Sequence, residues 1–232
     1  ARIFQLDNSY GFRKAIEEIH PDSFKDIASL LALYRPGPRN YISSFAKRKK
    51  GREKIEYKSP LLEPILRDTY GIRIYQEQVR NAVVALASFT SSDADLFRRA
   101  ISKKDVDKRK QYEPLFYQGA KKNGVREDLA KSIYEDVLKF AGYGFNKSHA
   151  YCYAYLTYEL LYYKANYPKE FYEAAFSSNS LGSSKSLQLR QELKDNKIKR
   201  NRPDINSSGV DDYLLTGDKC FIPLSVIKQC DK

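Results

Sequence analysis

The chain lacks several residue types on which particular classes of protein depend. Its 232 residues include no methionine, no tryptophan, two histidines and three cysteines. Cys152, Cys220 and Cys230 lie far apart, without C-x-x-C spacing, which predicts reduced thiols and argues against a disulfide framework or a zinc site. No apolar run approaches the roughly 18 residues of a membrane span, and no signal-peptide pattern occurs. We therefore expect a cytoplasmic protein, and we interpret the Met-free chain as a piece of a longer one.

Groups that could carry out a reaction are also scarce. His20 and His149 are isolated, and residues 144–148 (Gly-Phe-Asn-Lys-Ser) lack the second glycine of a Walker-type phosphate loop. Capping or turn formation explains the close acidic pairs, which are Asp93 with Asp95, Asp105 with Asp107, and Asp211 with Asp212. We therefore expect no metal site and no complete catalytic site in this chain.

What the chain has in excess is positive charge. It carries 41 Lys and Arg against 29 Asp and Glu, a formal net charge of +12, together with 19 tyrosines. Such a balance predicts a polyanionic partner, most simply nucleic acid, whose phosphates and bases would suit cations and aromatic rings. The alternative is a basic protein whose charge serves solubility alone.

A glycine-containing loop at residues 140–150 concentrates groups suited to a nucleotide. Gly142 and Gly144 permit a close approach of the backbone to a ligand. Aromatic faces and hydrogen-bond donors follow at the start of a predicted helix, where anions are favoured; these are Tyr143, Phe145, Asn146, Lys147, Ser148 and His149. The alternative is an ordinary turn between helices, with Ser148 as the N-cap.

A second cluster of cations lies upstream, on and just beyond one short predicted helix. It consists of Arg98, Arg99, Lys103 and Lys104. Arginine forks suit phosphate oxygens, and lysines act as point charges. The alternative is an ordinary surface helix in which Asp95 pairs with Arg99 one turn away. We favour anion binding, because the neighbouring acids are too few to neutralise the cluster.

Candidate contacts to a nucleic-acid backbone are scattered through the first third of the chain. Arg35 precedes the rigid turn at residues 36–38, where it could contact phosphate or cap a helix C-terminus. A basic run at residues 47–52 includes Lys47, Arg48, Lys49 and Arg52; such runs are more often solvated loops. Gln76 and Gln78 lie at the start of a predicted helix, where they could contact bases or sugars. The alternative is that they are ordinary polar surface residues.

The hydrophobic pattern predicts a mainly α fold with a small C-terminal part that contains strands. Helical spacing is clearest over residues 76–89, 107–123, 127–140 and 149–166. Short strands are expected near Ile198 and as a hairpin, residues 213–215 and 220–222, around the turn at residues 216–219. We predict a helical core over residues 1–178 and a C-terminal subregion over residues 179–232, joined at the Ser- and Gly-containing residues 179–184.

Six motifs in collinear order resemble the bacterial replicative DNA polymerase III alpha subunit, specifically its fingers domain. They are Ile-Phe-Gln-Leu (3–6), Leu-Tyr-Arg-Pro-Gly-Pro (33–38), Thr-Tyr-Gly-Ile (69–72) with Tyr-Gln-Glu-Gln-Val (75–79), Ala-Asp-Leu-Phe-Arg-Arg-Ala (94–100) with Lys103 and Lys104, Phe-Ala-Gly-Tyr-Gly-Phe-Asn-Lys-Ser-His (140–149), and Pro-Asp-Ile-Asn (203–206). The resemblance covers essentially the whole chain.

The resemblance implies half of a nucleotidyltransferase site, expected to be inactive alone. Mg²⁺ would be held by aspartates of a palm domain that this chain lacks. Arg98 and Arg99 would clamp the phosphates of an incoming dNTP, assisted by Lys103 and Lys104, and residues 143–149 would wall the nascent base pair. Implied partners are primer–template DNA, the rest of the alpha subunit, the sliding clamp and other replisome subunits. The alternative is a stand-alone basic nucleic-acid-binding module without a nucleotide pocket.

Overall fold

The computed structural model describes residues 3–6, 10–103, 105–141, 143–178 and 184–227, and it confirms the mainly α fold. The described residues contain eleven α-helices and one small three-stranded sheet. They form two compact units, one of residues 9–154 and one of residues 1–8 with 155–232, called here the N-terminal and C-terminal units. The predicted division at residue 178 falls inside the C-terminal unit, and it remains a prediction.

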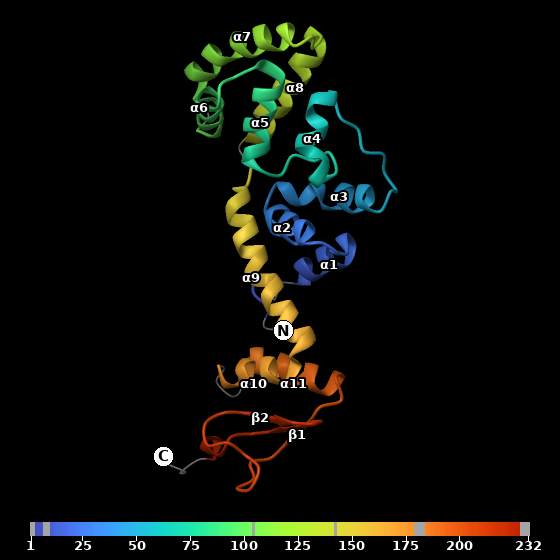
Figure 1. The fold of residues 1–232 in the computed structure, drawn as a ribbon, viewed down its shortest axis with the longest axis vertical. Coiled ribbons are helices and arrows are strands. Elements are labelled where there is room, and N and C mark those ends of the chain that lie inside the picture. The colour runs from blue at the N-terminus through green and yellow to red at the C-terminus, as the bar shows by residue number, and fades with distance from the viewer. Residues whose placement is uncertain (1–2, 7–9, 104, 142, 179–183, 228–232) are drawn as a thin grey trace. The chain divides into compact units, whose positions relative to one another are not determined.

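The N-terminal unit is built from helices and short 3₁₀ turns (Figure 1). Its α-helices are α1 Tyr10–Ile19, α2 Phe24–Leu33, α3 Ile42–Lys49, α4 Glu63–Leu66, α5 Gln76–Ala87, α6 Ser91–Ser102, α7 Val106–Lys122, α8 Glu127–Ala141 and the first part of α9 Lys147–Asn166. The 3₁₀ turns are η1 Pro38–Tyr41, η2 Pro60–Leu62 and η3 Arg67–Thr69.

Helices α5 to α8 enclose the main hydrophobic core of this unit, at the top of Figure 1. Each contributes apolar side chains from one face, as their helical spacing predicts. Val83 and Leu86 of α5, Phe97 of α6, Phe116 of α7 and Ile133 of α8 are all fully buried. This core fixes α6, and with it the two adjacent arginines, against the start of α5.

Local capping explains where several of these helices begin. The hydroxyl of Thr90 accepts a hydrogen bond from the Asp93 amide at the start of α6, and the Asp105 carboxylate accepts one from the Lys108 amide at the start of α7. Each cap satisfies an amide that has no partner inside its helix. The N-cap of α6 is therefore Thr90, and Asp93 lies in the first turn of the helix.

The C-terminal unit contains the second part of α9, α10 Pro168–Ser177, α11 Ser184–Asp195, η4 Leu224–Val226 and the sheet. Strand β3 Lys219–Phe221 lies between β1 Lys199–Asn201, which is parallel to it, and β2 Leu214–Thr216, which is antiparallel. The predicted hairpin is confirmed, with Gly217 at a φ of 59° in the turn. Of the predicted joint at residues 179–184, residues 179–183 lie outside the described residues.

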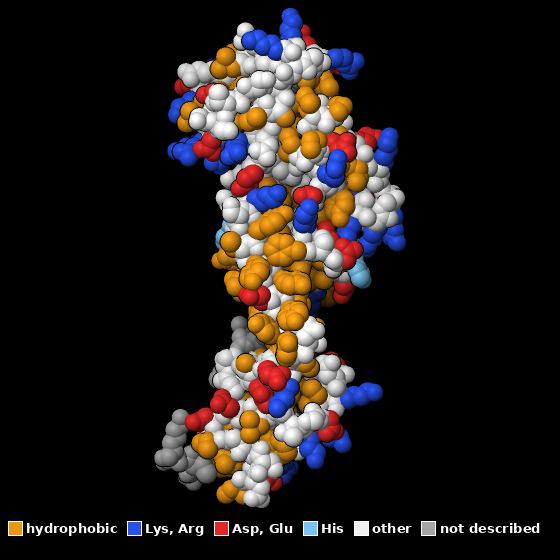
Figure 2. Space-filling model, viewed as in Figure 1, with side chains coloured by type: hydrophobic (Ala, Val, Ile, Leu, Met, Phe, Trp, Pro, Cys, Tyr) orange, Lys and Arg blue, Asp and Glu red, His pale blue; other side chains and the backbone are white. Residues whose placement is uncertain are grey.

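Tyrosines of α9 are exposed along much of the part that belongs to the C-terminal unit. Tyr155, Tyr158, Tyr162 and Tyr163 are each about half exposed, and Figure 2 shows hydrophobic side chains gathered over this helix. In the portion of the chain that the structure describes, no helix combines the length and apolarity required to span a bilayer.

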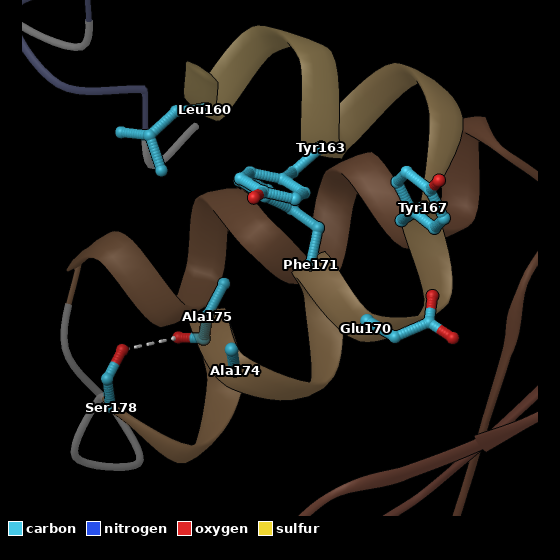
Figure 3. A pocket seen from close by; sticks show the side chains of 8 residues that line it. All are labelled: Leu160, Tyr163, Tyr167, Glu170, Phe171, Ala174, Ala175 and Ser178. Carbon is cyan, nitrogen blue, oxygen red and sulfur yellow. Dashed lines mark hydrogen bonds between the residues drawn. The ribbon is translucent and has the colours of Figure 1, made fainter. Parts of the chain in front are cut away.

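Helices α9 and α10 border a pocket of about 400 Å³ (Figure 3). Its lining is mainly apolar and aromatic and includes Tyr163, Tyr167 and Phe171, which Figure 3 draws together with Glu170. Among the described residues that line the pocket, Glu170 is the only charged one. The pocket is therefore poorly suited to a phosphate, and the cationic groups expected to bind one lie elsewhere.

Cys220, in the central strand β3, is predicted to be unreactive in the folded protein. It is fully buried, and burial raises the pKa of its thiol from 9.0 to about 11, whereas Cys152 is exposed. As the pH rises, the unfolded chain loses this proton first, so the associated stability is present below about pH 9 and is lost through about pH 11. In a Cys152→Ser/Cys230→Ser variant at pH 8, we expect a thiol reagent to react only after denaturant is added. Rapid labelling without denaturant would contradict this burial.

Candidate functional site

The loop between α8 and α9 is tied to the segment that leads into α5. The amide of Phe145 donates to the carbonyl of Ile74 at 3.0 Å, and the amide of Gln76 donates to the carbonyl of Phe145 at 2.9 Å. These two bonds form a short parallel bridge. The predicted nucleotide-binding loop is therefore held beside the start of α5, about 70 residues earlier in the chain.

The first turn of α9 already has acceptors for two of its amides. Asn146 is the N-cap, rather than Ser148, because its Oδ1 accepts from the His149 amide at 2.8 Å. The Lys147 amide donates to both carboxylate oxygens of Glu77, at 3.0 and 3.1 Å. A phosphate at these amides would displace two internal partners, so the side chains are the better candidates for anion contact. Ser148 and His149 are exposed there.

Gln76 joins the two predicted nucleotide-binding stretches. Its side-chain oxygen accepts a hydrogen bond from Nη1 of Arg98 at 2.8 Å, and its Nε2 donates to the carbonyl of Gly144 at 3.0 Å. A side-chain amide suits this position because it both donates and accepts. The cations of α6 and the glycine-containing loop are thus neighbours in space, as parts of one cluster.

Asp95 holds both arginines of α6. Nε and Nη2 of Arg98 donate to Oδ1 of Asp95 at 3.1 and 2.9 Å, and Nε of Arg99 lies 2.8 Å from Oδ2. The hydrogen bonds from Arg98, followed by the charge of both arginines, hold the pKa of Asp95 below its usual value. The predicted Asp95–Arg99 pair is therefore present, but one carboxylate faces two guanidinium groups.

The remaining cations of this cluster differ in exposure. The side chain of Arg99 is 64% exposed and that of Arg98 is 23% exposed. Lys103 is exposed at the end of α6, and Lys104 lies outside the described residues. Arg99 and Lys103 can therefore meet a ligand from solvent, while Arg98 is held between the helix and the loop.

Arg35 anchors the loop from its other side. Its Nε donates to the carbonyl of Ala32 near the end of α2, and its Nη2 donates to the carbonyl of Tyr143, both at 2.9 Å. Its guanidinium carbon lies 4.4 Å from the centroid of the Phe145 ring, and burial lowers the pKa of the guanidinium. The structure therefore gives Arg35 a positioning role, which includes the helix C-terminal contact considered as an alternative.

Aromatic rings continue from the loop into α9. The His149 ring lies between Phe145, at a centroid distance of 5.4 Å, and Tyr153, at 4.0 Å. Nζ of Lys147 lies 5.3 Å from the centroid of the Tyr151 ring. Tyr143 is 54% exposed. The loop thus presents an open ring at Tyr143, and His149 is exposed while contacting two neighbouring rings.

The basic run of residues 47–52 divides into buried and exposed members. Nζ of Lys49 contacts Asp22 and Asp26 at 3.0 and 2.9 Å and is largely buried. Arg48 donates to Glu53 at 2.7 Å and to the carbonyl of Tyr70 at 3.2 Å. Lys47 and Arg52 are exposed, so these two are the members best placed to meet a nucleic-acid backbone.

The side chain of Gln78 forms its hydrogen bonds with other groups of the protein. Its Oε1 accepts from the amides of Ile74 and Tyr75, and its Nε2 donates to the carbonyl of Ile65 and the hydroxyl of Thr69. It is 6% exposed. A DNA contact would break this buried network, so Gln78 is left out of the interface proposed below.

A metal site requires several donor side chains that converge on one point. Across the described ranges, no three His, Cys, Asp or Glu side chains gather in a way that could hold a metal ion. Asp95 is paired with two arginines and Glu77 with the α9 amide. The described residues therefore do not fit a Mg²⁺ site.

Comparison with known proteins identifies the family. The model of the bacterial DNA polymerase III alpha subunit finger domain matches residues 1–124. DNA polymerase III subunit alpha of Halalkalibacterium halodurans is 43% identical over 208 residues, covering 90% of this chain, and that of Chlamydia muridarum is 43% identical over 226 residues, covering 97%. The alignments span 18% of each of these relatives. The chain therefore belongs to the bacterial DNA polymerase III alpha subunit finger domain family.

Proposed function

We propose that this chain binds the triphosphate of an incoming dNTP together with primer–template DNA, as the fingers part of a DNA-directed DNA polymerase. The observation that carries the proposal is the Gln76 bridge from Arg98 to the Gly144 carbonyl. It supports a single nucleotide site, because it ties a cationic helix to a loop rich in aromatic and polar groups. Family membership gives such a site its substrate class.

Within this site, Arg99 and Lys103 meet the phosphates first, because both are exposed. Arg98 contacts them from a fixed position, and Lys104 follows Lys103 directly in the sequence. Residues 143–149 form the wall against base and sugar, through Tyr143, Phe145, Asn146, Lys147, Ser148 and His149. Guanidinium groups held in place before the ligand arrives lose less side-chain freedom on binding than mobile lysines do.

Primer–template contacts are assigned to Lys47 and Arg52, with Arg48 beside them in the chain, and to Gln76 at the start of α5. Each phosphate neutralised by a cation releases counterions and steepens the dependence of binding on salt. Lys49, through its buried ion pairs, and Arg35, through its loop contacts, hold their surroundings in place. Mg²⁺ held by a palm domain, the rest of the alpha subunit, the sliding clamp and other replisome subunits complete the proposed enzyme, which works in the cytoplasm. This chain alone is inactive.

Photo-crosslinking with azido-dATP, primer–template DNA and Mg²⁺ tests the proposal. We expect label in the peptides that contain residues 98–104 and 143–149, competed strongly by dATP and weakly by dAMP. Arg99→Gln lowers the labelling at least about tenfold, because a hydrogen bond to a charged group contributes roughly 1.5–3 kcal/mol.

Arg126→Gln is the matched control, since Arg126 is also exposed and paired with a nearby aspartate, Asp128. Labelling that fell equally in both variants, or that DNA alone competed as well as dATP did, would favour a stand-alone nucleic-acid-binding module without a nucleotide pocket.

A further inference from the structure

A second pocket lies in the N-terminal unit, and Tyr143 is part of its lining. It has a volume of about 620 Å³ and is bordered by η1, α3, the segment after η3, and α8. Its lining combines cations with aromatic rings, including Arg73, Lys139, Tyr41, Phe140 and Tyr143. We call it the Arg73 pocket. Its volume falls in the usual range for small-molecule and cofactor sites.

The guanidinium of Arg73 is largely buried, yet its hydrogen-bond donors lack good acceptors in the part of the chain that the structure describes. Its side chain is 14% exposed, and its Nη1 lies 3.4 Å from Oδ2 of Asp136. That same oxygen has a closer partner, Nζ of Lys58 at 2.7 Å. Nε of Arg73 is buried with no hydrogen-bond partner among the described residues. A buried donor without an acceptor is costly, so an anion with free oxygens would be favoured beside it.

The charge around this pocket is positive after its internal pairs are counted. Arg73, Lys139 and the carboxylate of Asp136 belong to the lining. Lys58, which is outside the lining, pairs with Asp136 at 2.7 Å, so the charges of Arg73 and Lys139 remain as a net two positive charges. The fourth cation, Arg48, is paired with Glu53 at 2.7 Å. Two charges suit one or two phosphodiester groups, each of which carries a single negative charge. A triphosphate carries more and is better matched by the α6 cluster.

Open aromatic faces supply the other half of a nucleotide site. Tyr41 and Tyr143 are 51% and 54% exposed, and both belong to the lining. Tyrosine rings at the edge of a basic groove bind unpaired bases by stacking, with little dependence on sequence. Lys139 and Asn40 are also exposed here, so a strand can enter and leave the pocket.

We propose that the Arg73 pocket holds one unpaired nucleotide of a DNA strand, with the base against Tyr41 and the phosphate beside Arg73 and Lys139. The assignment to DNA rests on the proposed function, because the polymerase family supplies the partner. The cations of this pocket differ from those of the α6 cluster, so single-stranded template and incoming dNTP contact different positive groups, and the two sites share only Tyr143 among the residues named here.

Binding of a 12-nucleotide single strand that contains 2-aminopurine tests this proposal, on this chain and on the complete alpha subunit. Tyr41→Ala weakens binding at least about fivefold and removes the change in 2-aminopurine emission, because base stacking on the ring is lost. Lys139→Gln makes the negative slope of log K against log salt shallower by about 0.7, the value for one phosphate contact on a single strand. Both side chains are exposed, so neither change opens a cavity.

Lys122→Gln is the matched control, because it removes one exposed lysine of the same unit outside the pocket. It leaves the emission change and the salt slope as they were. Equal losses in Lys122→Gln and Lys139→Gln would overturn the proposal in favour of general charge attraction. Competition by dAMP as effective as that by the strand would overturn the assignment to a strand. Arg99→Gln, which tests the dNTP site, leaves single-strand binding intact, so the two proposals fail separately.

Discussion

Gly119→Ala is expected to lower the free energy of unfolding by at least about 3 kcal/mol, at or above the upper end of the cost of overpacking a core. Gly119 is a buried residue of α7 that lies against the end of α5. A Cβ there would lie 2.0 Å from the carbonyl oxygen of Ala87 and 2.6 Å from its carbonyl carbon. Backbone atoms cannot rotate away, so α5 and α7 would have to separate, and the core they share would loosen.

Urea unfolding followed by far-UV circular dichroism measures this effect. Gly51→Ala provides the comparison, since Gly51 has a φ of 67° and open space where an added Cβ would lie. That variant should lose only the roughly 1–2 kcal/mol that an L-residue costs in the left-handed region. If Gly119→Ala were no more destabilising than Gly51→Ala, the close approach of α5 and α7 would be wrong. A Gly119→Ala chain that fails to fold agrees with the expectation.

Much of the fold follows from local sequence signals. The apolar stripe of α5 and that of α8 were predicted from helical spacing, and Val83 and Ile133 are indeed fully buried. The hairpin of β2 and β3 follows from two short apolar runs on either side of a Gly-containing turn. These features depend on residues a few positions apart, so the sequence alone contains the information.

The connections within the candidate site could not be predicted in the same way. Gln76 contacts Gly144, and Glu77 contacts the Lys147 amide, across 68 and 70 residues of chain. No periodicity reports such pairs, and the adjacent polar residues 76–78 look alike in sequence. In the structure, Gln76 bridges Arg98 and Gly144. Glu77 accepts from the first amide of α9, and Gln78 is a buried side-chain amide.

The basic run shows the same limitation for charge. Lys47, Arg48 and Lys49 are equivalent in a composition argument, yet α3 turns them about 100° apart. Lys49 is directed to the buried carboxylate of Asp26, and Arg48 to Glu53. Which lysine is free to meet DNA depends on the partners offered by α2 and the following loop, which only the folded chain reveals.

Arg98→Gln is expected to lower kcat/KM for dNTP incorporation by about 10²–10³ in the complete polymerase. This is the usual effect of removing one preorganised donor from a site where negative charge develops. Glutamine keeps a polar side chain but loses the charge and the fork that now contacts Asp95 and Gln76. Single-nucleotide incorporation on a primed template measures the effect, and Arg126→Gln is the matched control. Unchanged kinetics would remove Arg98 from the phosphate site.

A double-mutant cycle with Gln76→Ala separates phosphate contact from loop positioning. If Arg98 acts only by holding Gln76 against the loop, Gln76→Ala reproduces the whole loss and the double variant is no worse. If Arg98 contacts phosphate, Gln76→Ala retains the guanidinium, still held by Asp95, and costs less than Arg98→Gln. We expect the second result, because three donors of Arg98 are already directed by Asp95 and Gln76, and two of the five on a guanidinium remain to meet an oxygen anion.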